Sequence, residues 1–229
     1  MSPVTSTDFL IIGGGIAGAS VAYWLAPHAR VVVLEREPQP GYHSTGRSAA
    51  LFIETYGPAQ VRALTRASRP FFESPGNGFA EYPLLTPRGT LFIASQEQEK
   101  QLQEYWEEVS PSSTVTRRLD RAATCAMVPV LRADRVIGSV YEPEACDMDV
   151  HGIHQGYLRG MRGSGGVLHC DAEVTRIERD GAQWRVYAGE TTYSAPVVIN
   201  AAGAWVDAVA RMAGVAPIGI EPRRRSADG

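Results

Sequence analysis

The clearest pattern of apolar and polar positions lies in the first 35 residues. An apolar run, Phe9–Ile12, is followed by a glycine-rich stretch, then by apolar residues at helical spacing up to Leu25, and then by a second apolar run, Val31–Leu34. Short apolar runs on either side of a helix-spaced segment are typical of two parallel strands joined by a crossover helix. The pattern therefore predicts a βαβ unit at the start of the chain.

Weaker patterns predict the remaining elements. Asp120 stands at a favoured position for capping a helix, and the Gly-Ser-Gly-Gly sequence at 163–166 is a helix stop signal. Alternating or wholly apolar short runs predict strands, with Asp180-Gly181 as a hairpin turn. The predicted helices are 61–72, 95–109, 120–127, 149–162 and one that carries residues 205–212, and the predicted strands are 82–85, 90–94, 136–141, 167–170, 173–177, 184–187 and 196–200.

The order of these elements predicts an α/β fold. Wholly apolar runs suit a buried parallel sheet, so we expect a Rossmann-like domain with an inserted α+β domain of mixed or antiparallel sheet. A run of Ser, Pro, Gly and Asn at residues 74–78 marks the first boundary. The expected domains are a first nucleotide-binding segment at 1–78, an inserted substrate domain at 79–145, and a second nucleotide-binding segment at 146–229 that leads into an incomplete substrate domain.

Composition excludes several classes of protein. The chain has 229 residues, is 44% hydrophobic and has a formal net charge of −3, so we expect a globular protein without a polybasic surface for nucleic acid. The N-terminus lacks a cationic segment, and the first apolar run is too short for a signal peptide or a membrane span. The 3 cysteines are far apart and indicate reduced thiols in a cytoplasmic protein. His151 and His154 share a helix face without a third ligand at matching spacing, so we expect surface or core histidines and no metal site.

The turn after the first apolar run carries the first candidate chemistry. Gly13, Gly15 and Gly18 form the sequence G-x-G-x-x-G, which permits a tight turn, a close approach to a pyrophosphate, and close packing of helix on strand. The amides at the helix N-terminus would face that phosphate. Glu35 ends the second strand, where a carboxylate accepts hydrogen bonds from ribose hydroxyls. These residues predict an adenine-dinucleotide site, and the motif alone leaves FAD and NAD open.

The loop that follows Glu35 is a second candidate. Ser44 or Thr45 can cap a new helix, and the small residues after Arg47 would let a flat ligand lie against its first turn. An ordinary capped helix with a solvated Arg47 fits the same residues. The loop alone does not decide between these interpretations.

The glycine motif, Glu35-Arg36 and the stretch Gly-Tyr-His-Ser-Thr-Gly-Arg-Ser-Ala-Ala at 41–50 resemble the FAD-dependent D-amino-acid oxidase and dehydrogenase family, which includes glycine and sarcosine oxidases. The 41–50 stretch is most similar to the D-arginine dehydrogenase branch. The resemblance spans nearly the whole chain and selects FAD over NAD. It implies flavin contacts along the loop, an adenine contact from the backbone of Val174, and a second dinucleotide motif at Ala202-Gly203. The cofactor-binding residues so implied are Gly13, Gly15, Ile16, Ala17, Gly18, Glu35, Arg36, His43, Ser44, Thr45, Gly46, Arg47, Ser48, Ala49, Ala50, Val174, Ala202 and Gly203.

The same resemblance implies a reaction. The family oxidises the C–N bond of a D-amino acid or related amine to an imine by hydride transfer to flavin N5; hydrolysis then gives a 2-oxo acid and ammonia, and oxygen or a quinone accepts the electrons. Tyr56 matches the active-site tyrosine of the family; a tyrosine that only packs on a helix is the alternative. Among the substrate-binding positions, Leu51 replaces a histidine of the D-arginine branch and Thr90 replaces a glutamate that would pair with a guanidinium. Because a buried cation needs an opposite charge, these replacements favour a neutral substrate side chain.

Family members continue past the position equivalent to the last residue of this chain. The part beyond it includes a substrate-carboxylate arginine and a loop over the flavin, so we expect a C-terminally truncated chain that is inactive alone, or one that works with a complementary chain or as an oligomer. Three other classes fit the sequence: a non-catalytic FAD-binding subunit, a truncated remnant, and an NAD-dependent reductase. A visible absorbance spectrum separates the last of these from a flavoprotein.

Overall fold

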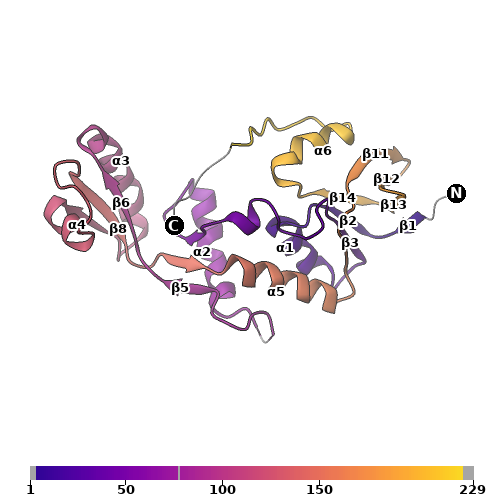
Figure 1. Ribbon diagram of the computed structural model, residues 1–229, viewed down its shortest axis with the longest axis horizontal. Helices are drawn as coiled ribbons and strands as arrows, with labels where there is room; N and C mark the ends of the chain where they lie inside the picture. The colour runs from indigo at the N-terminus through magenta and orange to yellow at the C-terminus, as the bar shows by residue number, and fades with distance from the viewer. Residues whose placement is uncertain (1–3, 77, 224–229) are drawn as a thin grey trace. The chain divides into compact units, whose positions relative to one another are not determined.

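The computed structural model describes residues 4–76 and 78–223, which form two compact units (Figure 1). Unit 1 comprises the chain up to Ala49, residues 77–82 and the chain from Val150 onward, and unit 2 comprises residues 50–76 and 83–149. These bounds differ from the predicted ones, which placed residues 50–76 and 146–149 in the nucleotide-binding segments and residues 79–82 in the inserted domain. Residues 50–76 and 146–149 belong to unit 2 because the strand that begins at Leu51 and the strand that begins at Leu85 both pair with Cys146 and Asp147.

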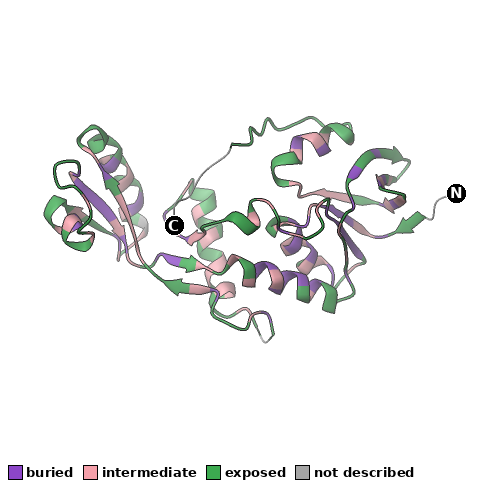
Figure 2. Cartoon of the chain, viewed as in Figure 1, coloured by how far each residue is buried: buried purple, intermediate pink, exposed green. Residues whose placement is uncertain are grey.

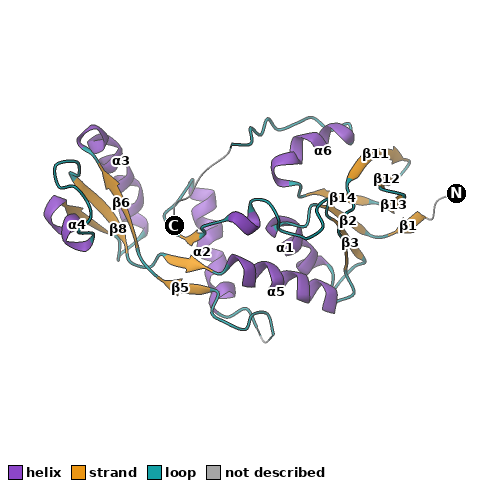
Figure 3. Cartoon of the chain, viewed as in Figure 1, coloured by secondary structure: helices purple, strands orange, loops and turns teal. Residues whose placement is uncertain are grey.

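Unit 1 contains a four-stranded parallel sheet with the order β10-β3-β2-β14. Its strands are β2 (Phe9–Ile12), β3 (Val31–Leu34), β10 (Val167–His169) and β14 (Val197–Asn200). Helix α1 (Ile16–Leu25) joins β2 to β3, which confirms the predicted βαβ unit, and it packs along α5 (Val150–Gly163), as Figure 3 shows.

A second sheet of unit 1 has the order β1-β13-β12-β11. Its strands are β1 (Val4–Ser6), β11 (Val174–Asp180), β12 (Gln183–Ala188) and β13 (Thr191–Ala195). The predicted hairpin between β11 and β12 is present, but its turn residues are Gly181, with φ +59°, and Ala182, because Asp180 still pairs with Gln183 in the sheet. The two sheets share one apolar core. Leu10, Ile12, Val32 and Leu34 of the parallel sheet cluster with Val174, Ile177, Val186 and Tyr193 of the second sheet.

The last helix of unit 1, α6 (Val206–Met212), contacts β14 and β11. It follows a 3-10 turn, η4 (Gly203–Trp205), so the predicted helix around residues 205–212 is present and begins one residue later. Because α6 and α1 both start just beyond the carboxyl ends of parallel strands, their N-termini lie at the same edge of the sheet.

Unit 2 contains an antiparallel sheet with the order β6-β8-β7 and the helices α3 and α4. Ala94, Leu102, Val109 and Val140 form its core. The Asp120 carboxylate accepts a hydrogen bond from the amide of Ala123 at 2.8 Å, which confirms the predicted cap. The bounds are β6 (Thr90–Ala94), α3 (Glu99–Val109), β7 (Arg117–Asp120), α4 (Arg121–Met127) and β8 (Gly138–Glu142).

A second small sheet of unit 2 has the strand order β4-β9-β5. Helix α2 (Ala59–Glu73) follows β4 in the chain, which confirms the amphipathic helix predicted at 61–72. No residue of α2 is buried, and Figure 2 draws the helix without the colour of buried residues. The strands of this small sheet are β4 (Leu51–Phe52), β5 (Leu85–Pro87) and β9 (Cys146–Met148). The strand predicted at 82–85 corresponds to β5, which begins later, at Leu85, and ends at Pro87.

Two predicted helices differ from the structure in kind. Residues 95–109 begin with a 3-10 turn, η2 (Gln96–Gln98), before α3 starts. The helix expected after Ser44 or Thr45 is only a three-residue 3-10 turn, η1 (Thr45–Arg47). Along the described residues no helix is both long and apolar enough to cross a membrane.

Candidate functional site

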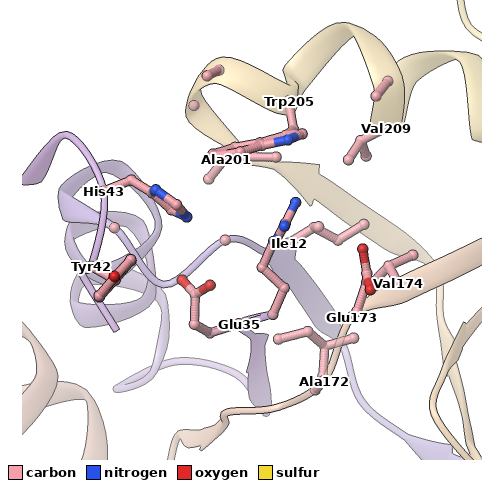
Figure 4. Close-up of a pocket in the computed structure, with 18 of the residues that line it drawn as sticks. Ile12, Glu35, Tyr42, His43, Ala172, Glu173, Val174, Ala201, Trp205 and Val209 are labelled. Carbon is pink, nitrogen blue, oxygen red and sulfur yellow. The ribbon is translucent and has the colours of Figure 1, made fainter. Parts of the chain in front are cut away.

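A pocket in unit 1 opens where the four parallel strands end (Figure 4). Gly13 follows β2, Glu35 follows β3, Ala201 follows β14, and Ala172 lies shortly after β10. All four residues line the pocket. Open parallel sheets bind their ligands at the carboxyl ends of the strands, so the position agrees with the predicted nucleotide site.

Two of the three motif glycines, Gly13 and Gly18, leave no room for a side chain, and Gly15 leaves little. Gly13 has φ +110°, and a Cβ atom there would overlap the carbonyl oxygen of Ala201. A Cβ on Gly18 would overlap the carbonyl oxygen of Gly13, so this glycine allows α1 to approach the end of β2. A Cβ on Gly15 would lie 3.2 Å from the hydroxyl of Thr45. The turn can therefore bring its backbone close to a ligand in the pocket.

Glu35 is held at the floor of the pocket. Its side chain is only 7% exposed, although it is a carboxylate. One carboxylate oxygen accepts a hydrogen bond from the amide of Gly14 at 2.9 Å, and the other accepts one from the amide of Glu37 at 3.0 Å. Each oxygen can accept a second bond, so the carboxylate is fixed in position and can still bind ribose hydroxyls.

The loop after Glu37 folds back onto the start of α1. Gly41 has φ +77°, and its carbonyl oxygen accepts a hydrogen bond from the amide of Gly46 at 2.7 Å, which closes the loop on itself. The hydroxyl of Thr45 accepts a hydrogen bond from the amide of Ile16 at 3.0 Å. Thr45 therefore satisfies a first-turn amide of α1 instead of capping a helix of its own.

The side chains of Arg36, Glu37, His43 and Trp205 form a cluster at the pocket, and Glu37 and Trp205 were not predicted site residues. The guanidinium carbon of Arg36 lies 4.7 Å from the centre of the Trp205 ring, and the His43 ring centre lies 4.6 Å from it. His43 Nε2 and Arg36 Nε both donate to one oxygen of Glu37, at 2.8 and 3.1 Å. The bond from His43 is the main reason that the pKa of Glu37 lies below its usual value. For Trp205, its place after the small-residue turn at 201–204 was the only signal in the sequence.

His154 is a further residue that sequence reasoning did not place at the site. It is buried on α5, and its Nε2 lies 2.8 Å from the carbonyl oxygen of Gly14, whereas His151 is exposed. Burial is the main cause that lowers the pKa of His154, so the ring is neutral at pH 7. Among the described residues no group of three or more His, Cys, Asp and Glu side chains is arranged to hold a metal ion.

The predicted cofactor residues divide into two groups. Those that line the pocket are Gly13, Gly15, Glu35, Arg36, His43, Ser44, Thr45, Val174, Ala202 and Gly203. Those outside its lining are Ile16, Ala17, Gly18, Gly46, Arg47, Ser48, Ala49 and Ala50. Ala50 belongs to unit 2, and the Arg47 guanidinium carbon lies 4.9 Å from the centre of the Tyr42 ring.

A second, apolar pocket lies within unit 2. It brings together two of the predicted substrate residues, Leu51 and Tyr56, and the Tyr56 side chain is 58% exposed. Its other lining residues are Phe52, Ile53, Val61, Leu64, Thr65, Ser68, Phe72 and Met148. The third predicted residue, Thr90, does not line this pocket; it pairs with Glu142 between β6 and β8.

The parallel sheet, the glycine turn and the fixed carboxylate after the second strand of the βαβ unit together define a dinucleotide-binding protein. A family model described as FAD dependent oxidoreductase matches residues 8–227. The chain belongs to this family, and its cofactor is FAD.

Curated relatives are similar over nearly the whole of this chain. Human mitochondrial sarcosine dehydrogenase is 29% identical over 225 residues, which cover 93% of this chain and 24% of that protein. L-2-hydroxyglutarate dehydrogenase of Escherichia coli K12 is 24% identical over 223 residues, which cover 92% of this chain and 50% of that protein. The chain thus spans from about a quarter to about a half of the length of these relatives.

Solved structures share the fold. Glycine oxidase from Geobacillus kaustophilus aligns with a TM-score of 0.82 at 20% identity, covering 92% of this chain and 59% of that one. L-alpha-glycerophosphate oxidase from Mycoplasma pneumoniae, a structure with FAD bound, aligns with a TM-score of 0.79 at 18% identity, covering 91% of this chain and 57% of that one. These likenesses confirm the predicted α/β FAD-binding fold.

Proposed function

We propose that the chain carries the FAD site of an oxidoreductase that oxidises the C–N bond of an amino acid or amine. The observation that carries the cofactor part is the pocket at the ends of the four parallel strands, with Glu35 fixed in it. Bound FAD would supply the electron-accepting chemistry at its isoalloxazine ring. The substrate part rests on the family and on relatives such as sarcosine dehydrogenase.

The residues of the pocket have distinct roles in this proposal. Glu35 binds the ribose hydroxyls, and the backbone from Gly13 to Gly15 lies against the pyrophosphate with the positive end of α1 behind it. Ala202 and Gly203 line the pocket next to the glycine turn. The backbone of Val174 is proposed to contact the adenine. Its pairing with Ala188 is followed by a register shift before Arg176, and such bulges often occur beside binding sites.

The apolar pocket of unit 2 supports a neutral substrate side chain. None of its lining residues is charged, and Tyr56 is proposed to position the substrate there. Glu142 is the acid paired with Thr90, but it is buried and does not line this pocket. A guanidinium in the pocket would therefore lack a free carboxylate, and its desolvation would be uncompensated.

D-configuration, and with it the D-arginine branch, remains a prediction from the 41–50 stretch. The L-2-hydroxyglutarate dehydrogenase relatives give a specific reason to keep a second candidate, oxidation of the C–O bond of a 2-hydroxy acid. The electron acceptor, oxygen or a quinone, and any complementary chain or oligomer are likewise proposals.

The experiment uses protein isolated from its source, with its visible spectrum recorded and its flavin reduction followed anaerobically. The panel contains D- and L-methionine, D- and L-leucine, D-arginine, sarcosine and L-2-hydroxyglutarate. We expect a flavin spectrum and faster bleaching by a neutral amino acid or amine than by D-arginine. Fastest bleaching by the hydroxy acid would replace the proposed substrate class, and a colourless protein that does not bind added FAD would contradict the cofactor site.

A further inference from the structure

His154 lies outside every motif that the sequence suggested, yet it reaches the glycine turn. It comes from α5, it is 3% exposed, and its Nε2 is 2.8 Å from the carbonyl oxygen of Gly14. A carbonyl oxygen only accepts hydrogen bonds, so Nε2 carries the hydrogen and donates it. The residues are 140 positions apart in the chain, so the bond ties two distant segments of unit 1 together.

This bond fixes the direction of an amide that lines the pocket. The carbonyl of Gly14 and the N–H of Gly15 belong to one planar trans peptide group, in which the two bonds point in opposite directions. When His154 holds the carbonyl toward α5, the N–H of Gly15 must point away from α5. Gly15 lines the pocket, and its amide is one of those expected to face a pyrophosphate.

The preceding peptide group is held as well. The N–H of Gly14 donates to Glu35 at 2.9 Å, so both sides of Gly14 are bonded, one to the ribose-binding carboxylate and the other to His154. Glycine has the least restricted backbone of all residues, so without these bonds the turn could adopt other orientations. The bonds of Gly14 to Glu35 and to His154 together hold the turn in one orientation.

The surroundings of His154 maintain its position. A Cβ on Gly41 would lie 2.9 Å from Cε1 of the His154 ring, so the ring contacts the loop that carries Thr45 as well as the glycine turn. Because burial keeps the ring neutral, its single N–H is directed to Gly14 alone.

We propose that His154 is a positioning residue of the FAD site, which aims the Gly15 amide at the pyrophosphate and holds Glu35 through the peptide groups of Gly14. This inference rests on the proposed contacts between FAD and the glycine turn.

The test compares FAD dissociation constants of the wild-type chain and variants, measured by titrating flavin-free protein and following flavin fluorescence. His154→Met fills the space without a donor, His154→Gln places an amide donor close to the position of Nε2, and His151→Met is the exposed control on the same helix. We expect His154→Met to raise the dissociation constant about tenfold, which corresponds to about 1.4 kcal/mol. His154→Gln should restore affinity to within about threefold of wild type, and His151→Met should leave it unchanged.

A double-mutant cycle separates positioning from packing. If His154 acts through Gly14, His154→Met should weaken FAD binding less in a Glu35→Ala background than in the wild type, because the two residues share one bonded unit. If the histidine only packs, the losses add, and Gln does not rescue. His154→Asn, which is polar but too short to reach Gly14, replaces Met if the Met variant does not fold.

The outcomes are distinct. A wild-type chain that binds FAD, together with a His154→Met variant of equal affinity, overturns this inference and leaves the FAD site intact. A wild-type chain that does not bind FAD overturns the site itself, and this inference with it.

Discussion

Glu142 is a buried carboxylate in unit 2, and its negative charge lowers the stability of the folded protein. It is 3% exposed, and no ion pair among the described residues includes it. Its oxygens accept hydrogen bonds from the amide of Glu54 at 3.1 Å and from the hydroxyl of Thr55, and the Thr55 oxygen lies 2.9 Å from the hydroxyl of Tyr105. Burial outweighs these bonds and raises the pKa of Glu142. The ionised form is therefore less favourable in the folded protein than in the unfolded chain.

Glu142→Gln removes the charge and keeps the bonds. The amide oxygen can still accept from Glu54, and the amide N–H₂ can donate to Thr55, which then turns its own hydrogen to Tyr105. A carboxyl group with a raised folded-state pKa costs no stability below its unfolded pKa of about 4.3, and the cost grows as the pH rises toward the folded pKa. We expect the variant to match wild type near pH 4 and to be more stable at pH 7.5, by about 1.36 kcal/mol for each pH unit by which the folded pKa exceeds the unfolded one.

Glu142→Ala is the matched contrast. It leaves the Glu54 amide without its partner, whereas Thr55 keeps Tyr105, so we expect a loss of about 1–3 kcal/mol for one buried unsatisfied donor, before any loss from the cavity. Hydrogen exchange of β6, β7 and β8 against urea reports the free energy of unfolding of this unit, at pH 4 and pH 7.5. A Gln variant less stable than wild type at pH 7.5, and equal to it at pH 4, would show that the bonds to the carboxylate outweigh its burial and would refute the argument.

Three further variants test the structure. Glu35→Ala should weaken FAD binding by about 1.5–3 kcal/mol for each ribose bond lost, in a flavin titration where the exposed Glu190→Ala is the control; equal affinities would contradict the ribose assignment. Gly18→Ala should separate α1 from the end of β2 and raise the FAD dissociation constant at least tenfold, about 1.4 kcal/mol, whereas Gly163→Ala, where nothing lies within 4 Å of the new Cβ, should not. Asp120→Ala should cost about 1 kcal/mol in urea unfolding and Asp120→Asn much less, because Asn still caps α4.

The sequence was sufficient for the parts of the fold that local signals determine. Wholly apolar runs identified β2, β3 and β14, and the glycine motif located the turn between β2 and α1. Strands β1 and β13 were missed because they are rich in Thr and Ser and pair with each other across almost the whole chain, from Val4 to Thr192. The strand conformation of β1 depends on that long-range pairing, which short-range patterns do not report. Strand β13 also pairs with its neighbour β12 in a tight hairpin that its polar sequence did not reveal.

In the candidate site, as in the fold, the residues that could be predicted are those determined by local signals in the sequence. Gly13, Gly15 and Glu35 line the pocket as the motif requires, because their roles depend on backbone geometry close in sequence. Trp205 of η4 meets Arg36 and His43, and His154 of α5 meets the glycine turn, in both cases only through tertiary packing. The helix predicted after Ser44 failed for a related reason, since the Thr45 hydroxyl bonds the amide of Ile16, 29 positions away.

The two pockets divide the proposed function between the two units. Every residue that lines the cofactor pocket belongs to unit 1, and every residue that lines the apolar pocket belongs to unit 2. The bonds that fix Glu35, Thr45 and His154 also have both partners within unit 1. Substitutions at Leu51 or Tyr56 should therefore change substrate preference and leave FAD affinity unaffected, because neither residue lines the cofactor pocket or takes part in the bonds that fix Glu35, Thr45 and His154. We therefore expect that cofactor retention and substrate choice can be varied separately, and a Tyr56 variant that loses FAD would show that the division is wrong.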